Sequence, residues 1–165
     1  MAAAFAVENT LGKLAKWLRI LGFDTVFDSG AGGVDFFRCA STDRVLLTRT
    51  ASVKKQLRSE RLLLVQSDDP RQQLLEVIRH LGIRPEDIRP FTRCLACNQV
   101  IESVEKRSIR DKVPDFVYDS HEHFRQCPRC RKVFWSGSHA SRAAQRIRQL
   151  FDAPQQPGDG AMPPV

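Results

Sequence analysis

The sequence predicts an α/β domain with a parallel sheet, followed by a small module that carries paired cysteines. In the first ninety residues, short apolar runs alternate with amphipathic stretches, which is the pattern of a parallel sheet flanked by helices. The apolar runs are continuous, as expected of strands that helices cover on both faces. From Arg84 onward the pattern changes, and four of the five cysteines follow.

The apolar run at 4–7 predicts the first strand, and Asn9 or Thr10 can cap the helix that follows it. Apolar residues recur in that helix at intervals of three and four, and they are Leu11, Leu14, Ala15, Leu18 and Leu21. Gly22 is placed to end the helix. Residues 24–28 predict the second strand.

After a glycine-rich loop, residues 34–40 predict a short helix, and the apolar runs at 44–48 and 61–65 predict the third and fourth strands. Two further helices are predicted from the intervening and following sequence, at 52–58 and 70–81. Gly82 is the predicted stop of the last of these helices.

These elements divide the chain into an α/β domain at 1–84 and a second module at 90–151, joined by a proline-containing linker. A basic helix at 141–151 is predicted to close the second module. The remaining residues, 152–165, are rich in proline and glycine and are predicted to be disordered.

The overall charge favours a polyanionic partner. The chain has 26 Lys and Arg against 19 Asp and Glu, a net charge of +7, and phosphates neutralised by such cations release counterions. No apolar run approaches ~20 residues, so no membrane span is predicted. The N-terminus lacks the basic flank of a secretory signal, and a cytoplasmic location is expected.

Two Cys-x-x-Cys pairs stand in the second module, Cys94 with Cys97 and Cys127 with Cys130. Two such pairs can place four thiolates around one zinc ion, whereas disulfides or a single redox pair are the alternatives. The intervening 29 residues (98–126) exceed the commonest spacing, which an inserted loop can explain. Because four protein ligands leave no open position, this zinc is predicted to be structural.

Isolated residues that could carry chemistry have simpler interpretations. Cys39 lies in an apolar stretch and is expected to be a buried, inert thiol. Trp17 and Trp135 could stack on bases, but burial in the core is the favoured interpretation.

Acidic residues follow several of the predicted strands, where ligands gather in a parallel sheet. They are Glu8, Asp28, Asp68 and Asp69, with Asp35 one turn into the second helix. Carboxylates that converge repel one another unless a divalent cation lies among them, so a cluster here predicts Mg²⁺ or Mn²⁺. The alternative is that these acids are helix caps and solvated residues.

Several segments resemble the Mut-seven C-terminal RNase domain family: they are ENTLGKLAKWLRILGFDT, RVLLTRT, QQLLEVI, FTRCLACN and FRQCPRCRKVFWSGSH. The resemblance covers roughly residues 5–150. It implies a PIN-like domain, with its parallel sheet flanked by helices, joined to a zinc ribbon. It also implies a metal-dependent ribonuclease activity, with RNA as the partner.

The resemblance implies that Glu8 and Asp35 are the principal ligands of a catalytic Mg²⁺ or Mn²⁺, with Asp28 auxiliary. Two positions depart from the family. Glu8 stands where the family usually has Asp, and Thr50 stands where the family has an acid after the third strand. A threonine adds no negative charge, so the site is expected to be weakened. Asp24 also matches the family and is interpreted as structural.

Lys13, Lys16 and Arg19 recur every three residues along the first helix, and Arg49 lies beside the predicted site. They could contact RNA phosphate, or the lysines and Arg19 could form a solvated helix face. Two main functions follow from the sequence: a metal-dependent ribonuclease, or a non-catalytic RNA-binding module of the same fold. A protein-binding adaptor is a more remote third.

Overall fold

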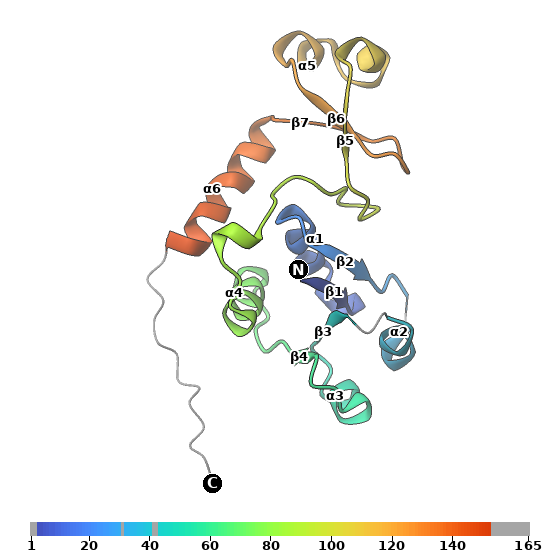
Figure 1. The fold of residues 1–165 in the computed structure, drawn as a ribbon, viewed down its shortest axis with the longest axis vertical. Coiled ribbons are helices and arrows are strands. Elements are labelled where there is room, and N and C mark those ends of the chain that lie inside the picture. Colours follow the sequence, from blue (N-terminus) through green and yellow to red (C-terminus); the bar gives the residue numbers. More distant parts are fainter. Residues whose placement is uncertain (1–2, 31, 41–42, 153–165) are drawn as a thin grey trace.

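The computed structural model describes residues 3–30, 32–40 and 43–152. A parallel four-stranded sheet forms one end of the elongated molecule, and a three-stranded antiparallel sheet lies toward the other (Figure 1). The parallel strands have the order β2-β1-β3-β4, and their bounds are β1 Ala4–Val7, β2 Asp24–Phe27, β3 Arg44–Thr48 and β4 Leu62–Leu64. The predicted α/β class with a parallel sheet is therefore confirmed.

Helices cover both faces of this sheet: α1 is Gly12–Ile20, α2 Gly33–Cys39, α3 Ala51–Leu57 and α4 Pro70–Leu81. Successive residues of a strand point to opposite faces. Phe5 and Val7 accordingly pack in the core that contains α1 and α4, whereas Ala6 packs with α2 and α3. Both faces are dry, which explains the continuous apolar runs.

The predicted helix at 70–81 is confirmed over its full length because both ends carry local signals. The Asp69 carboxylate accepts hydrogen bonds of 3.0 Å from the backbone N–H groups of Arg71 and Gln72. Gly82 ends the helix in the left-handed conformation, with φ of +61°.

Gly22 follows the end of α1, and its lack of a side chain lets the linker approach this end of the helix. Its φ is +95°, and a Cβ at this position would lie 2.2 Å from the carbonyl oxygen of Arg89. The backbone N–H groups of Arg89 and Phe91 donate to carbonyls of Leu21 and Ile20, each at 2.9 Å. The linker is therefore hydrogen-bonded to the end of α1.

The prediction that Cys39 is buried is wrong. This thiol is exposed at the last residue of α2, and Phe37 is the residue of this helix that is buried in the core. Cys39 has apolar neighbours in the sequence, but the helix is only seven residues long and Cys39 does not lie on its inner face.

The second module contains the antiparallel sheet β5-β6-β7, formed by Glu102–Val104, Phe124–Gln126 and Val133–Trp135. The segment between the two cysteine pairs is more than a loop. It contains a 3₁₀ helix, η3 (Lys106–Lys112), and α5 (Asp115–Ser120). These pack on the sheet around a small core of Ile109, Val113, Val117 and Phe124.

The last helix, α6 (Ser138–Asp152), returns from the antiparallel sheet to the first domain (Figure 1). Its Ile147 and Leu150 belong to the same buried cluster as Leu14 and Leu18 of α1. The division of the chain at residues 84–90 stays a prediction, and the two parts share core contacts through α6. Of the predicted disordered tail, residues 153–165 lie outside the described residues.

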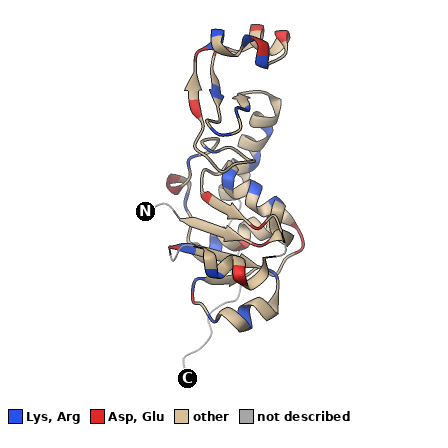
Figure 2. Ribbon diagram, turned by 90° about the vertical axis from the view of Figure 1, so that its right-hand side faces the viewer, with Lys and Arg blue, Asp and Glu red and all other residues tan. Residues whose placement is uncertain are grey.

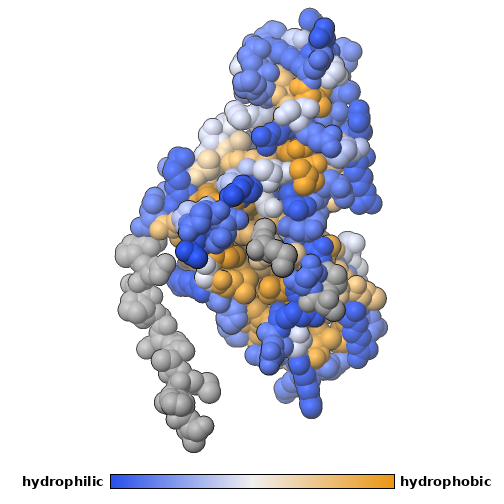
Figure 3. Space-filling model, in the orientation of Figure 1, coloured by the Kyte–Doolittle hydropathy of each residue, from blue (hydrophilic) through white to orange (hydrophobic). Residues whose placement is uncertain are grey.

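Within the described part of the chain, every helix is too short or too polar to cross a bilayer. On the face in Figure 3, hydrophobic residues reach the surface in separate patches among hydrophilic ones.

Candidate functional site

The four cysteines form a closed cluster. Their Sγ atoms all lie within 4.8 Å of one another, and those of Cys94 and Cys130 are 3.7 Å apart. Zinc–sulfur bonds of about 2.3 Å in a tetrahedron would separate the sulfurs by about 3.8 Å. The four side chains are thus positioned to hold a metal ion, and their chemistry and spacing fit zinc.

The two cysteine pairs adopt the same turn. Asn98 and Arg131 each follow the second cysteine with φ of +62°. Their N–H groups donate to the carbonyls of Cys94 and Cys127, at 2.9 and 3.0 Å. The N–H groups of Cys97 and Cys130 point to the sulfurs of Cys94 and Cys127, both at 3.5 Å. This repetition brings two thiols from each turn to one point.

The pKa values of the thiols also favour a cation. Burial raises the pKa of Cys94 above its ordinary value, and the hydrogen bond with Cys130 raises the pKa of Cys97 to about 12. The backbone N–H of Lys132 lowers the pKa of Cys130 to about 7. Thiols this close cannot all ionise by themselves, whereas a bound zinc ion stabilises all four thiolates.

Glu8 and Asp28 lie side by side at the carboxyl edge of the parallel sheet. Each directly follows its strand, and the last residues of these strands, Val7 and Phe27, are register partners. The N–H of Asp28 donates to the Val7 carbonyl at 3.0 Å. Glu8 is only 5% exposed and Asp28 only 7%. The fold therefore brings two buried carboxylates to neighbouring strand ends.

The donors that reach the Glu8 carboxylate from the described residues are all uncharged. Its Oε1 accepts from the Thr10 hydroxyl and the Arg49 backbone N–H, each at 2.6 Å, and Oε2 accepts from the Thr48 hydroxyl. Among the described residues, no side-chain nitrogen of Lys or Arg lies within 4.0 Å of a carboxylate oxygen of Glu8 or Asp28. Two buried acids without a cationic partner are a suitable environment for a bound cation.

Thr50 borders the same carboxylate. Its hydroxyl donates to Glu8 Oε1 at 3.4 Å, and its backbone N–H donates to the Thr48 hydroxyl at 2.9 Å. A side chain at position 50 therefore reaches Glu8, although the two residues are 42 positions apart.

A groove of about 560 Å³ opens beside these acids. Thr10 and Arg49, both hydrogen-bonded to Glu8, are among its lining residues. The lining also includes the remaining cations predicted from the sequence, Lys13, Lys16 and Arg19. The structure thus brings all four cations to one groove, which we call the cationic groove. Figure 2 shows Lys and Arg residues distributed over the whole length of the molecule.

Comparison with known proteins identifies the family. Residues 3–147 match the model of the family described as Mut7-C RNAse domain. The chain belongs to this family. No curated protein and no solved structure matches the chain. The Mut7-C match spans both the parallel sheet and the cysteine cluster, so the two parts described above form one family unit.

In this Mut7-C chain, Asp35 does not join Glu8 and Asp28. Its carboxylate is 84% exposed and pairs with Arg38 at 3.2 Å on the surface of α2. Among the described residues, the cysteines form the one group of three or more acidic, cysteine or histidine ligands within 4.8 Å of one another. The role of Asp35 as a metal ligand stays a prediction that this arrangement does not support.

Asp68 lies at the cationic groove, where it pairs with Arg49, and Asp69 caps α4. Asp24 has the predicted structural position, at the start of β2. Burial alone would raise the pKa of Asp24, but hydrogen bonds from Arg44 at 2.9 Å and Asn98 at 2.8 Å outweigh it and lower the pKa. Asp24 therefore connects the sheet to the first cysteine turn.

Arg19 also connects the two parts of the Mut7-C fold. Arg19 is only 9% exposed, and its guanidinium donates two hydrogen bonds to the Thr25 carbonyl, at 2.9 and 3.0 Å. It donates as well to the carbonyls of Leu95 and Ala96 in the first cysteine turn, at 2.7 and 3.2 Å. Desolvation lowers the pKa of Arg19 from its ordinary value. Its donors are thus used for structure, and Lys13 and Lys16 remain exposed at the groove.

Replacing Arg19 by Met is expected to lower the free energy of unfolding by about 3 kcal/mol, because buried carbonyls lose charged hydrogen-bond donors. Urea unfolding measures this change. The matched control, Lys16→Met, removes an exposed cation of the same helix and should change stability by less than about 0.5 kcal/mol. An Arg19→Met variant of unchanged stability but reduced RNA affinity would contradict the structural role.

Sequence reasoning missed the threonines that position Glu8. The sequence predicts Thr10 as a possible helix cap and Thr48 as the end of a strand, whereas the structure places both hydroxyls against Glu8. The Thr10 hydroxyl meets Glu8 because the two residues are only two positions apart in the chain. The Thr48 hydroxyl meets Glu8 because β1 and β3 are neighbours in the sheet, with Val7 paired to Leu47. Only knowledge of the strand order could have indicated this contact.

Proposed function

We propose that this Mut7-C chain is a metal-dependent ribonuclease that hydrolyses phosphodiester bonds at the carboxyl edge of its parallel sheet. The observation that carries the proposal is that Thr10 and Arg49, which line the cationic groove, are hydrogen-bonded to the buried Glu8, with the buried Asp28 at the end of the neighbouring strand. Phosphates need cations and a divalent metal needs carboxylate oxygens, and both kinds of side chain are within reach of one bound strand.

In this proposal, Lys13, Lys16 and Arg49 bind the RNA backbone and fix its position along the groove. Glu8 and Asp28 would hold Mg²⁺ or Mn²⁺, and the bound ion would supply activation of water and stabilisation of the leaving oxygen. Thr10 and Thr48 orient the Glu8 carboxylate through hydrogen bonds. Thr48 is the last residue of β3 and Thr10 lies in the short 3₁₀ helix Asn9–Leu11 that follows β1, so regular backbone holds both groups, which favours a fixed geometry.

The cysteine cluster has a different role in the proposal. It binds one zinc ion that is structural, because all four positions of the tetrahedron come from the protein. Leu95, within the first cysteine turn, lines the cationic groove. The zinc-bound turn therefore forms part of the RNA-binding surface as well as holding the fold together.

The Glu8→Gln variant tests the proposal. We expect its Mn²⁺-dependent cleavage of single-stranded RNA to fall by more than about 100-fold, because even groups that only orient metal ligands cost 10–100-fold when removed. Glu60→Gln, which removes an exposed carboxylate, is the control for charge. Circular dichroism checks that both variants fold. Equal cleavage by Glu8→Gln and wild type would exclude Glu8 from the active site.

A non-catalytic RNA-binding module is the second candidate function. Two observations favour it: a threonine occupies the position beside Glu8 where the family has an acid, and Asp35 points to solvent. This candidate keeps the cationic groove and loses the chemistry. It predicts RNA binding without cleavage at any Mn²⁺ concentration, and RNA affinity unchanged in Glu8→Gln.

A further inference from the structure

We infer that a second groove, between α1, α4 and α6, binds a further stretch of the same single-stranded RNA. This inference rests on the proposed function, because it extends the strand that the cationic groove would hold. The second groove has a volume of about 440 Å³ and is formed by residues from all three helices. We call it the α6 groove.

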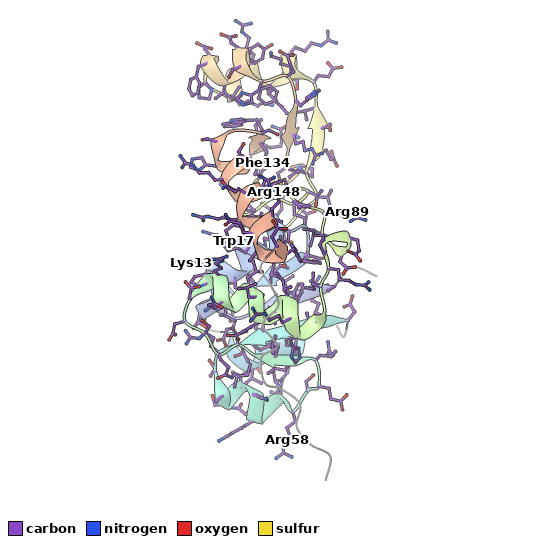
Figure 4. All side chains as sticks on the ribbon, turned by 90° about the vertical axis from the view of Figure 1, so that its left-hand side faces the viewer. Lys13, Trp17, Arg58, Arg89, Phe134 and Arg148 are labelled. Carbon is purple, nitrogen blue, oxygen red and sulfur yellow. The ribbon has the colours of Figure 1, made fainter. Side chains whose placement is uncertain are left out.

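The two grooves adjoin each other. Lys13 and Pro70 line both of them, so the cationic groove and the α6 groove share a wall made by α1 and the start of α4. Lys13 and Trp17 both belong to α1, and in Figure 4 they lie close together near the lower end of α6. A strand that leaves the cationic groove past Lys13 therefore enters the α6 groove.

The charges in the α6 groove suit a polyanion. Lys13, Arg71 and Arg146 line it from three different helices. Among the described residues, no carboxylate oxygen lies within 4.0 Å of a side-chain nitrogen of these three cations. The acid in the lining, Asp69, accepts hydrogen bonds from two backbone N–H groups of α4, which offset part of its charge.

The apolar part of the lining suits an unpaired base. Trp17 packs against the main core with part of its side chain and also lines the groove, together with Leu74 and Leu150. A base can stack on such an aromatic side chain only when it is free of a duplex, and stacking contributes about 1–3 kcal/mol per base. Cations beside the partly buried indole of Trp17 therefore favour a single strand.

Arg146 and Arg148 provide a matched pair for a test. Arg146 lines the α6 groove, whereas Arg148 is exposed on the same helix and lines neither groove. Two residues along an α-helix correspond to a rotation of about 200°, so the two side chains leave opposite sides of α6. Both substitutions remove one charge from the same element, and only one removes it from the groove.

The test measures binding of single-stranded RNA of about 4 and about 12 nucleotides to the full chain, without Mg²⁺ or Mn²⁺ so that no cleavage occurs. Wild type should bind the longer RNA at least about 10-fold more tightly. Arg146→Ala should lose most of this advantage while binding the shorter RNA as wild type does. For the longer RNA, the slope of log K against log salt should become less steep in Arg146→Ala. The change should be about 0.7 for each phosphate that the variant no longer neutralises. Arg148→Ala should resemble wild type.

Tryptophan fluorescence gives an independent readout. The chain has two tryptophans, so Trp135→Phe leaves Trp17 as the one emitter. The longer RNA should quench this emission, and the shorter RNA should leave it unchanged. Quenching that requires the longer strand would place RNA at the α6 groove without relying on any charge substitution.

The outcomes separate this inference from the proposed function. If Arg146→Ala and Arg148→Ala lose equal affinity for the longer RNA, or if affinity does not depend on RNA length, the α6 groove is not an RNA-binding site. Glu8-dependent cleavage would still support the ribonuclease in that case. If the chain binds RNA but does not cleave it, the ribonuclease proposal is rejected. The binding measurements would then still test whether the α6 groove binds RNA. A wild-type chain that binds neither RNA would overturn both.

Discussion

Replacing Thr50 by Asp is expected to turn a weak divalent-metal site into a strong one. The Thr50 hydroxyl lies 3.4 Å from Glu8 Oε1, so an Asp at this position places a second carboxylate against the first. Two carboxylates this close repel each other in the absence of a cation and bind a divalent ion between them. Without metal, the variant should therefore unfold at a lower temperature than wild type.

When the Mn²⁺ concentration is about 100 times the dissociation constant of the variant for Mn²⁺, the free energy of unfolding of Thr50→Asp should rise by about 2.7 kcal/mol. For a chain of this size, that gain corresponds to an increase of about 5–10 °C in the unfolding temperature. Wild type should gain less at the same Mn²⁺ concentration, and cleavage of RNA should rise in the variant. Thermal unfolding with and without Mn²⁺ measures the first effect.

Thr50→Asn is the matched control, because Asn has the shape of Asp and no charge. If Asp and Asn at position 50 respond alike to Mn²⁺, the missing acid of the family does not belong at this position.

Replacing Cys127 by Ser is expected to abolish zinc binding. Cys127 is fully buried in the cysteine cluster, and serine is a poor ligand for zinc. Wild type should contain about one zinc per chain, and the variant almost none. Structural zinc contributes about 10–16 kcal/mol to folding of small zinc-dependent modules, so amide protection should be lost across residues 91–135. Metal analysis and hydrogen exchange measure these two changes.

Cys39→Ser is the control, since it removes an exposed thiol outside the cluster. It should keep zinc and protection at wild-type levels. Zinc loss should also weaken RNA binding, because Arg19 is hydrogen-bonded to the first cysteine turn at the wall of the cationic groove. A Cys127→Ser chain that retains zinc and full protection would show that the cluster is not the zinc site.

The sequence was sufficient where local signals agreed with burial. The strands at 4–7 and 44–48 and the helix at 70–81 were predicted with their observed bounds, because apolar runs and end signals are local. The cysteine turns were predicted for the same reason, since two-residue spacing alone brings two thiols together. The helices between the cysteine pairs were not predicted, because each is too short to show a clear period.

Arg19 shows what spacing cannot predict. Residues three apart on a helix are about 300° apart, so Lys13, Lys16 and Arg19 drift around α1 by about 60° at each step. After two steps Arg19 faces the first cysteine turn and is buried there, while both lysines stay exposed. Where that turn docks is a property of the tertiary structure, which the sequence period does not contain.

The acidic site was predicted in part for a similar reason. Glu8 and Asp28 follow adjacent parallel strands, so their proximity follows from the sheet order. The position of Asp35 depends on the rotation of α2, a helix of seven residues, and there its carboxylate pairs with Arg38 instead.

A crystal structure of the chain soaked in Mn²⁺, with anomalous diffraction recorded, tests the central claim most directly. The account predicts a manganese peak at the carboxyl edge of the sheet, about 2.1 Å from a carboxylate oxygen of Glu8 and in reach of Asp28. A map without a peak at Glu8, in crystals whose cysteine cluster is filled with zinc, would contradict it.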